Sequence, residues 1–327
     1  MIALLAAAML VASDAPRTIL FVGNSFTFGA MADAMTYRTD SVTDLNHDGM
    51  GGVPALFKRF ADEAGLRYDV SLETGAGRTL AWHLANKRGV IDRPWDAVVL
   101  QQYSTLSPER PGDVTETIAA ARGLARLFRH RNPRVDISLV ATWTRPDRTY
   151  PSGQFWSGKP IQRMALDLRK ADERVRAAVP SIRRVIPVGE AFNCAIARKT
   201  ADPNPYDGIS SGQVDLWASD HYHASNEGYY LEALTIFAAV TQADPRRLGR
   251  FEAAARDLRI RPEVAASLQA IAFQLAATGR CGKARKRPGF ARGQCAMNPP
   301  ASGLAAGPED ARAMVRRDAP AEGSKCF

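Results

Sequence analysis

The 327-residue chain is long enough for one large domain, or for one domain with appendages. Hydrophobic residues make up 46% and charged residues 24%, the balance of an ordinary globular protein. The formal net charge is +9, but no aromatic-interleaved basic stripe, helix-turn-helix pattern or zinc finger accompanies it. The sequence therefore argues against a nucleic-acid-binding protein.

Residues 1–13 are almost entirely apolar. This run is too short to span a bilayer, which takes about 20 residues. It has the size of the apolar core of a signal peptide, and the small residues Ala12 and Ser13 end it. We therefore expect a signal peptide over 1–13 and an exported protein, periplasmic or secreted, although no Lys or Arg precedes the apolar run. A buried N-terminal helix is the alternative. No later stretch is long and apolar enough to anchor the chain in a membrane.

Apolar runs then alternate with amphipathic stretches, which is typical of an α/β protein with a mostly parallel sheet. The predicted strands are residues 18–22, 68–72, 97–100, 136–142 and 184–188. The predicted helices are residues 53–64, 113–128, 161–178 and 227–240, a segment near 250, and 262–277. This order predicts one domain over 16–278, a three-layer α/β/α sandwich with a five-stranded parallel sheet. Sites in such sheets form beyond the carboxyl ends of the strands.

Residues 279–327 form a basic tail rich in Pro and Gly, which we expect to be disordered or tied by disulfides. Its positive charge allows peripheral contact with anionic envelope components. No two of the four cysteines have Cys-x-x-Cys spacing, which argues against a zinc site. An even count in an exported protein permits disulfides, and Cys281 with Cys295 is the first pairing to test.

The first predicted strand is followed by Gly23-Asn24-Ser25-Phe26-Thr27. A serine at this turn displays its hydroxyl at the sheet edge, where backbone N–H groups also point. Serine is a weak nucleophile without a base. A helix N-cap is the alternative role for Ser25.

A base is available near the other end of the domain, in Asp220-His221-Tyr222-His223. An Asp three residues before a His on a loop can fold back onto the imidazole and leave its other ring nitrogen free to take the serine proton. His221 is adjacent to Asp220 and cannot easily make that contact, so His223 is the candidate. The remaining His83 and His130 are interpreted as surface or helix residues.

These two blocks resemble the first and last blocks of the SGNH (GDSL-like) hydrolases, in the right order and at the two ends of the domain. Asn226 and Gly228 extend the likeness of the last block. The resemblance implies a flavodoxin-like fold and a catalytic set of Ser25, Asp220 and His223. The family also places a glycine N–H in the oxyanion hole after the second strand. That role falls to Gly77, with Gly75 as the lesser choice.

The third block departs from the family pattern. Where the family usually has Gly-x-Asn, with the Asn side chain as an oxyanion donor, this chain has Gln101-Gln102-Tyr103-Ser104. A Gln amide can donate the same hydrogen bond from a longer arm, and the position at the strand end favours Gln101 over Gln102. The chain is thus similar to a divergent branch of the superfamily that carries Gln in this block.

The resemblance implies a serine esterase that hydrolyses carboxylic esters, with the N–H groups of Ser25 and Gly77 and a Gln amide as oxyanion donors and with no cofactor. A carbohydrate O-acetylesterase is the leading interpretation, and the substrate would be an acylated glycan or a lipid. A lipase, lysophospholipase or thioesterase, and a non-catalytic glycan-binding module on the same fold, are the alternatives.

Two other segments bear on the site. Trp143 and Arg145 follow the fourth predicted strand, so they are candidates for stacking on a sugar or binding a negatively charged substrate; a loop whose Trp packs on the sheet is the alternative. Residues 44–49 match the opening of a calcium loop, but Ala55 stands where the loop needs an acid. We therefore expect no metal there, only a polar loop beside the site.

Overall fold

A computed structural model describes residues 15–282. The predicted signal peptide and nearly all of the predicted tail lie outside these residues. The described part has a six-stranded sheet in the order β2-β3-β1-β4-β5-β6, with every pair of neighbours parallel. The strands are β1 (Arg17–Gly23), β2 (Thr43–Asp44), β3 (Tyr68–Thr74), β4 (Ala97–Gln101), β5 (Asp136–Val140) and β6 (Ile182–Ile186).

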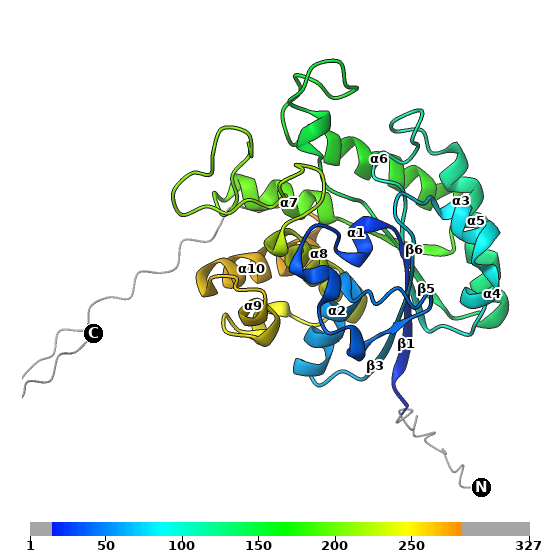
Figure 1. Cartoon of the computed structure of the whole chain (residues 1–327). Coiled ribbons are helices and arrows are strands. Elements are labelled where there is room, and N and C mark those ends of the chain that lie inside the picture. The colour runs from blue at the N-terminus through cyan, green and yellow to red at the C-terminus, as the bar shows by residue number, and fades with distance from the viewer. Residues whose placement is uncertain (1–14, 283–327) are drawn as a thin grey trace, which may run out of the picture. The chain divides into compact units, whose positions relative to one another are not determined.

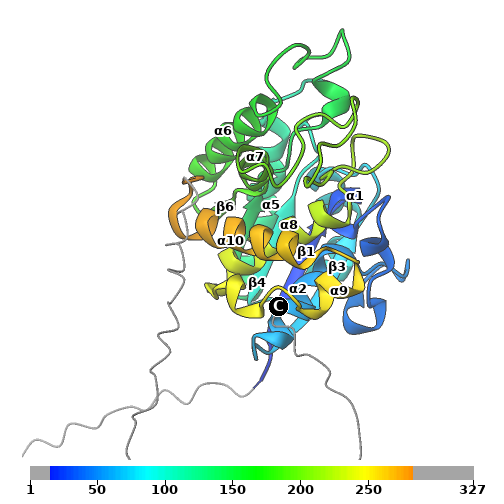
Figure 2. The same ribbon diagram turned by 90° about the vertical axis from the view of Figure 1, so that its left-hand side faces the viewer.

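Two layers of helices cover the sheet, which is seen edge-on in Figure 1; Figure 2 looks onto the layer that contains α8 and α10. The long helices are α2 (Gly52–Glu63), α5 (Thr115–Arg131), α6 (Arg163–Ala178), α7 (Val188–Ala197), α8 (Asn226–Thr241) and α10 (Pro262–Thr278). The short ones are α1 (Ser25–Phe28), α3 (Leu80–Asn86), α4 (Arg88–Ile91) and α9 (Ala253–Asp257), with 3-10 turns η1 (Asp33–Thr36), η2 (Thr39–Ser41), η3 (Pro146–Arg148) and η4 (Pro245–Leu248).

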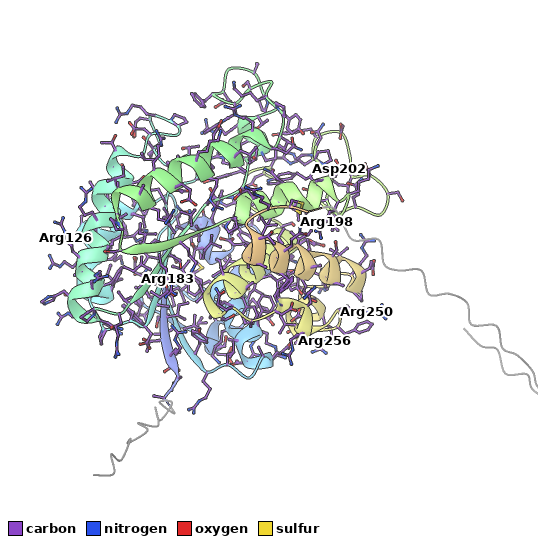
Figure 3. The ribbon with its side chains drawn as sticks, turned by 180° about the vertical axis from the view of Figure 1, so that it is seen from behind. Arg126, Arg183, Arg198, Asp202, Arg250 and Arg256 are labelled. Atoms are coloured by element: carbon purple, nitrogen blue, oxygen red, sulfur yellow. A yellow bond between two sulfur atoms is a disulfide. The ribbon has the colours of Figure 1, made fainter. Side chains whose placement is uncertain are left out.

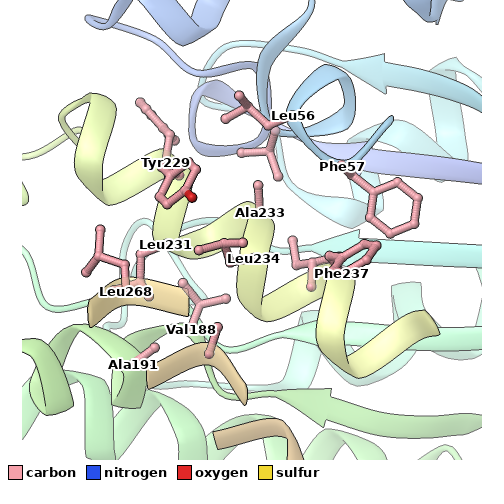
Figure 4. Packing of buried hydrophobic residues seen from close by; sticks show 14 of the residues in the cluster. Leu56, Phe57, Val188, Ala191, Tyr229, Leu231, Ala233, Leu234, Phe237 and Leu268 are labelled. Atoms are coloured by element: carbon pink, nitrogen blue, oxygen red, sulfur yellow. The ribbon is translucent and has the colours of Figure 1, made fainter. Parts of the chain in front are cut away.

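Alternation along the central strands divides the core in two. In β1, Ile19 and Phe21 face the layer of α2, α7, α8 and α10, whereas Leu20 and Val22 face α3, α5 and α6. A strand covered on both sides has no solvent face, which is why its sequence is continuously apolar. Figure 4 shows the first cluster, where Phe57 of α2 and Phe237 of α8 meet over the sheet at a ring separation of 6.1 Å.

The predicted α/β sandwich is confirmed, with one correction: the sheet has six strands rather than five. The extra strand, β2, has two residues and pairs Thr43 with Ser71 and Asp44 with Leu72 at the edge. So short a strand has no periodicity of its own, and only its neighbour β3 makes it one. The helices α3, α4 and α7 were also not predicted.

A disulfide joins Cys194 of α7 to Cys281, just beyond α10. The predicted pairing of Cys281 with Cys295 is therefore wrong. The two helices pack against each other, which brings together sulfurs separated by 87 residues in sequence. Across the described residues, no helix is both long enough and apolar enough to cross a membrane. Basic side chains on this part of the chain are dispersed: Arg126, Arg183 and Arg256 lie on separate elements (Figure 3).

Candidate active site

Ser25 lies at the first position of α1, directly after β1. Asn24 is the N-cap of this helix, and its side-chain oxygen accepts a hydrogen bond from the N–H of Phe26 at 3.2 Å. The capping role considered for Ser25 thus belongs to its neighbour. The buried Ser25 hydroxyl has no hydrogen-bond partner within residues 15–282. The side chain is therefore held at the sheet edge without being used for structure.

The predicted base lies on the loop that precedes α8, residues 218–225, which we call the histidine loop; residues 23–27 are the serine turn. Nδ1 of His223 lies 2.6 Å from the Asp220 carboxylate, which also accepts the backbone N–H groups of Tyr222 and His223 at 3.0 and 2.9 Å. Burial alone would raise the pKa of Asp220, but hydrogen bonds from the His223 ring and these N–H groups outweigh it and hold the pKa below its usual value. Asp220 is therefore an anion at neutral pH, and it selects the tautomer with a proton on Nδ1.

The fold brings this loop to the serine turn. The His223 ring centroid is 5.7 Å from that of Phe26, the residue after Ser25. The Tyr229 hydroxyl, one turn into α8, lies 3.3 Å from the Ser25 carbonyl oxygen. Nε2 of His223 is buried and has no partner in the described part of the chain, so it is not bonded to the Ser25 hydroxyl. Such hydrogen bonds are often long in enzymes without substrate and tighten when it binds.

The predicted oxyanion glycines lie in the turn after β3. Gly75 donates its N–H to the Gly23 carbonyl at 3.1 Å, so that N–H is already used. The chain then turns, and the Arg78 backbone carbonyl accepts a hydrogen bond from the Asn24 side chain at 3.2 Å. This bond connects the turn after β3 to the serine turn. Gly77 has φ +65° and faces open space, so a side chain is disfavoured there by the backbone and not by its neighbours.

The N–H groups of Ser25 and Gly77 find no acceptor within residues 15–282. Two unbonded N–H groups on turns that are tied together provide donors of the kind an oxyanion requires. Of the two glycines, Gly77 is the one whose N–H has no acceptor in the described residues, and its role as an oxyanion donor stays a prediction.

Both glutamines of the third block are buried braces. The side-chain oxygen Oε1 of Gln101 accepts from the Asn24 N–H and the Thr27 hydroxyl, each at 3.0 Å, and the side-chain nitrogen Nε2 donates to the backbone carbonyl of Gln102. The Gln102 side chain accepts from the Leu80 N–H at 2.9 Å. Gln101 therefore stabilises the serine turn through hydrogen bonds to Asn24 and Thr27. Its service as an oxyanion donor stays a prediction.

Trp143 is not available to a substrate, because its side chain is 0% exposed. Its ring stacks on Phe26 at 4.0 Å and on Phe192 at 5.1 Å, each with an interplanar angle of 7°. Its indole N–H donates to the Tyr222 carbonyl at 3.2 Å. The structure thus corrects the predicted substrate contact: Trp143 is a core residue that joins the serine turn to the histidine loop.

Arg145 is corrected in the same way. Arg145 is 4% exposed, and its guanidinium pairs with both oxygens of Asp147 at 3.0 and 2.6 Å and donates to the Ser104 hydroxyl at 3.0 Å. It also lies over the Tyr222 ring, 3.7 Å from the centroid. The charge of this guanidinium is neutralised by Asp147, and its contact with the Tyr222 ring supports the histidine loop. It is therefore not available to bind an anionic substrate.

One buried polar pair was missed. His83 of α3, interpreted as a surface or helix residue, is 0% exposed, and its Nδ1 lies 2.5 Å from the equally buried Glu73 of β3. Asn46, from the calcium-like loop, donates to Glu73 at 3.2 Å and to the Thr74 carbonyl at 2.7 Å. The pair and Asn46 anchor the strand end that precedes the Gly75–Gly77 turn. The sequence signal that could have revealed this pair is Glu73, a charged residue that directly follows the apolar strand predicted over residues 68–72.

The calcium-like loop is closed by its own first residue. The Asp44 carboxylate accepts the N–H groups of Asn46, Asp48 and Met50 at 2.9 to 3.1 Å. No group of three or more His, Cys, Asp or Glu side chains suited to a metal occurs in the described residues.

No protein-family model and no curated protein sequence matches the chain. Solved structures do. The chain is similar to a DUF4886 family protein from Bacteroides uniformis, with a TM-score of 0.56 and 18% identity, covering 81% of this chain and 96% of the other. A protein described as a GDSL-like lipase from Parabacteroides merdae gives 0.48 and 18%, covering 70% and 96%. A psychrotrophic esterase from a Pseudoalteromonas species gives 0.44 and 10%, covering 69% and 97%. The likeness to the Bacteroides uniformis protein shows that the two chains share an α/β fold.

Proposed function

We propose that this protein is a carboxylic ester hydrolase in which Ser25 is the nucleophile, His223 the general base and Asp220 the residue that orients the base. One observation carries the proposal. A histidine ring whose Nδ1 is fixed by a carboxylate at 2.6 Å has its Nε2 buried and unbonded, beside a strand-to-helix turn that displays an unbonded serine. This is the arrangement that activates a serine.

In the proposed reaction, Nε2 of His223 takes the Ser25 proton as the Ser25 oxygen attacks the ester carbonyl. The carbonyl oxygen becomes an anion, which the N–H groups of Ser25 and Gly77 stabilise. The imidazolium then gives its proton to the departing alcohol, and the acyl group stays on Ser25. A water molecule, deprotonated by His223, attacks this acyl ester, and collapse of the second tetrahedral intermediate returns the proton to Ser25 and releases the acid.

We also propose that the protein acts outside the cytoplasm. The apolar run at residues 1–13 supports export. The Cys194–Cys281 disulfide supports it independently, because disulfides persist mainly in oxidising compartments.

The test is labelling with a fluorophosphonate together with hydrolysis of p-nitrophenyl acetate. Wild type should be labelled and active. Ser25→Ala should lose both properties while its circular dichroism and melting temperature stay unchanged. Ser219→Ala, an exposed serine just before Asp220, is the matched control and should behave as wild type. Hydrolysis retained in Ser25→Ala would show that the nucleophile lies elsewhere. A folded wild type that is neither labelled nor active would favour a binding module instead.

A further inference from the structure

Two tyrosines stand exposed on separate loops beside the candidate site. Tyr150 follows η3 and is 40% exposed; Tyr206 lies in the loop between α7 and the histidine loop and is 47% exposed. Their rings are 5.7 Å apart, so the two loops meet through these side chains. In Figure 1 both loops lie on the upper side of the molecule, toward which β1 runs before α1 begins. Exposed aromatic residues that gather in this way mark binding surfaces.

The tyrosine pair is directly connected to the histidine loop. The Tyr206 ring is 4.2 Å from the ring of His221. His221 precedes His223 by two residues, a span of at most about 7 Å along the backbone. The Asp147 N–H, three residues before Tyr150, donates to the His221 carbonyl at 3.2 Å. A ligand resting on Tyr206 would therefore have its neighbouring groups within reach of the base.

Local hydrogen bonds fix both loops. The Tyr150 hydroxyl donates to the Pro203 carbonyl at 2.8 Å, which joins the two loops a second time. The buried Asp202 carboxylate accepts the N–H groups of Asn204 and Ser210 at 3.0 and 2.9 Å, and so closes the segment that carries Tyr206. The aromatic faces are thus pre-organised, which lowers the entropic cost of binding.

Polar groups border the rings. Asn204 donates to the exposed Asp207 carboxylate at 2.6 Å, and Asp207 has no cationic partner among the described residues. Burial, with the negative charges of Asp207 and Asp202, raises the pKa of Tyr150 to about 12. The phenol is therefore a neutral hydroxyl at physiological pH, and the surroundings carry negative charge. Asp147 adds no free charge, because Arg145 pairs with it.

We propose that Tyr150 and Tyr206, with Asn204 and Asp207, form a subsite for a neutral sugar ring of an O-acylated saccharide whose ester group enters the Ser25 site. This rests on the proposed function. A sugar ring has an apolar C–H face and a rim of hydroxyl groups, which match an aromatic face bordered by an amide and a carboxylate.

The same groups disfavour other esters. An anionic headgroup would be repelled by Asp207, since no cation lies beside that carboxylate in the described residues to offset it. A long acyl chain would cover the polar groups of Asn204 and Asp207 without giving them a hydrogen-bond partner in place of water, which costs free energy. The sugar-binding surface that the sequence placed at Trp143 thus lies, on this proposal, on the two loops beside it.

The experiment compares kcat/KM for O-acetylated xylo-oligosaccharides with kcat/KM for p-nitrophenyl acetate, which has no sugar. Tyr206→Ala should lower the ratio of the two values by about tenfold or more, mainly through KM for the saccharide. Tyr206→Phe keeps the ring and should retain most of the ratio. Phe251→Ala removes another exposed aromatic residue, just before α9, and should leave the ratio unchanged.

A ratio that is the same in wild type and Tyr206→Ala would overturn the subsite. So would a Tyr206→Ala variant that loses activity on short-chain phosphatidylcholine and not on the saccharide. Failure of the proposed function gives a different result, in which wild type hydrolyses neither ester. Binding of unacetylated xylotetraose, measured by titration calorimetry, then tests the subsite directly: weaker binding by Tyr206→Ala supports it, and equal or absent binding overturns it.

Discussion

Replacing Arg145 distinguishes a residue that binds substrate from one that supports the catalytic loop. Its guanidinium contacts both Asp147 oxygens, the Ser104 hydroxyl and the Tyr222 ring, and it is almost completely buried. Arg145→Met keeps much of the apolar volume and removes the charge and every side-chain hydrogen bond. If the contacts seen here define its role, the variant should lose stability and turnover together, with substrate affinity preserved.

The size of the stability loss follows from the partners left behind. Removing one member of a buried ion pair typically costs about 3–5 kcal/mol, because the other charge stays buried and unpaired. The Asp147 side chain is 28% exposed, so water can solvate it in part. We therefore expect a loss of about 2–3 kcal/mol. For a domain of this size that lowers the melting temperature by roughly 4–6 °C.

The loss of turnover follows from the ring contacts. The Tyr222 ring rests on the guanidinium at 3.7 Å and on the His223 ring at 4.0 Å. When the guanidinium is removed, the support on one side of Tyr222 is lost. A displacement of about 1 Å at a catalytic group can cost on the order of a hundredfold in rate. Arg145→Met should thus lower kcat by about 10- to 100-fold and change KM little.

The assay is steady-state hydrolysis of p-nitrophenyl acetate, together with a thermal melt of the same preparation. Arg148→Met is the matched control, since Arg148 approaches Asp147 only at 3.8 Å and is more exposed; its kcat and melting temperature should change little. A raised KM with unchanged kcat and an unchanged melting temperature in Arg145→Met would refute the supporting role and restore the substrate contact that the sequence suggested.

Two further predictions concern the triad and the disulfide. Asp220→Asn should lower kcat by about 10³- to 10⁴-fold, because the amide no longer fixes the tautomer of His223; a variant as active as wild type would remove Asp220 from the mechanism. Folding lowers the pKa of Asp220, so the ionised carboxylate stabilises the folded state fully at pH values above its ordinary pKa of 3.8. This stabilisation is lost as the pH falls through the lower pKa of the folded state. The greater stability of wild type over Asp220→Asn in urea melts should therefore disappear at strongly acidic pH. Breaking Cys194–Cys281, whose residues are 87 apart in sequence, with the double Ala variant should cost about 2–4 kcal/mol, and thermal melts insensitive to both reductant and substitution would contradict this.

Much of the fold was evident in the sequence, because apolar periodicity is a local property. The buried strands over residues 18–22 and 97–100, and the long helices other than α7, were predicted within a few residues of their observed bounds. Elements whose stability depends on neighbours were not predicted. β2 is two residues long and exists through pairing with β3, and α3 has only seven residues, too few for a helical periodicity to stand out in the sequence.

The sequence by itself determined the candidate chemistry: a serine after the first strand, and an Asp-x-x-His pair whose three-residue spacing lets the two side chains meet locally. The tertiary structure alone decided the roles of Trp143 and Arg145, and which cysteines pair. Residue type and position along the chain are the same for a side chain that faces solvent and one that faces the core. The direction in which a side chain points is set by packing between distant segments. Here Phe26 stacks on Trp143, and Tyr222 accepts the Trp143 indole N–H and places its ring on the Arg145 guanidinium.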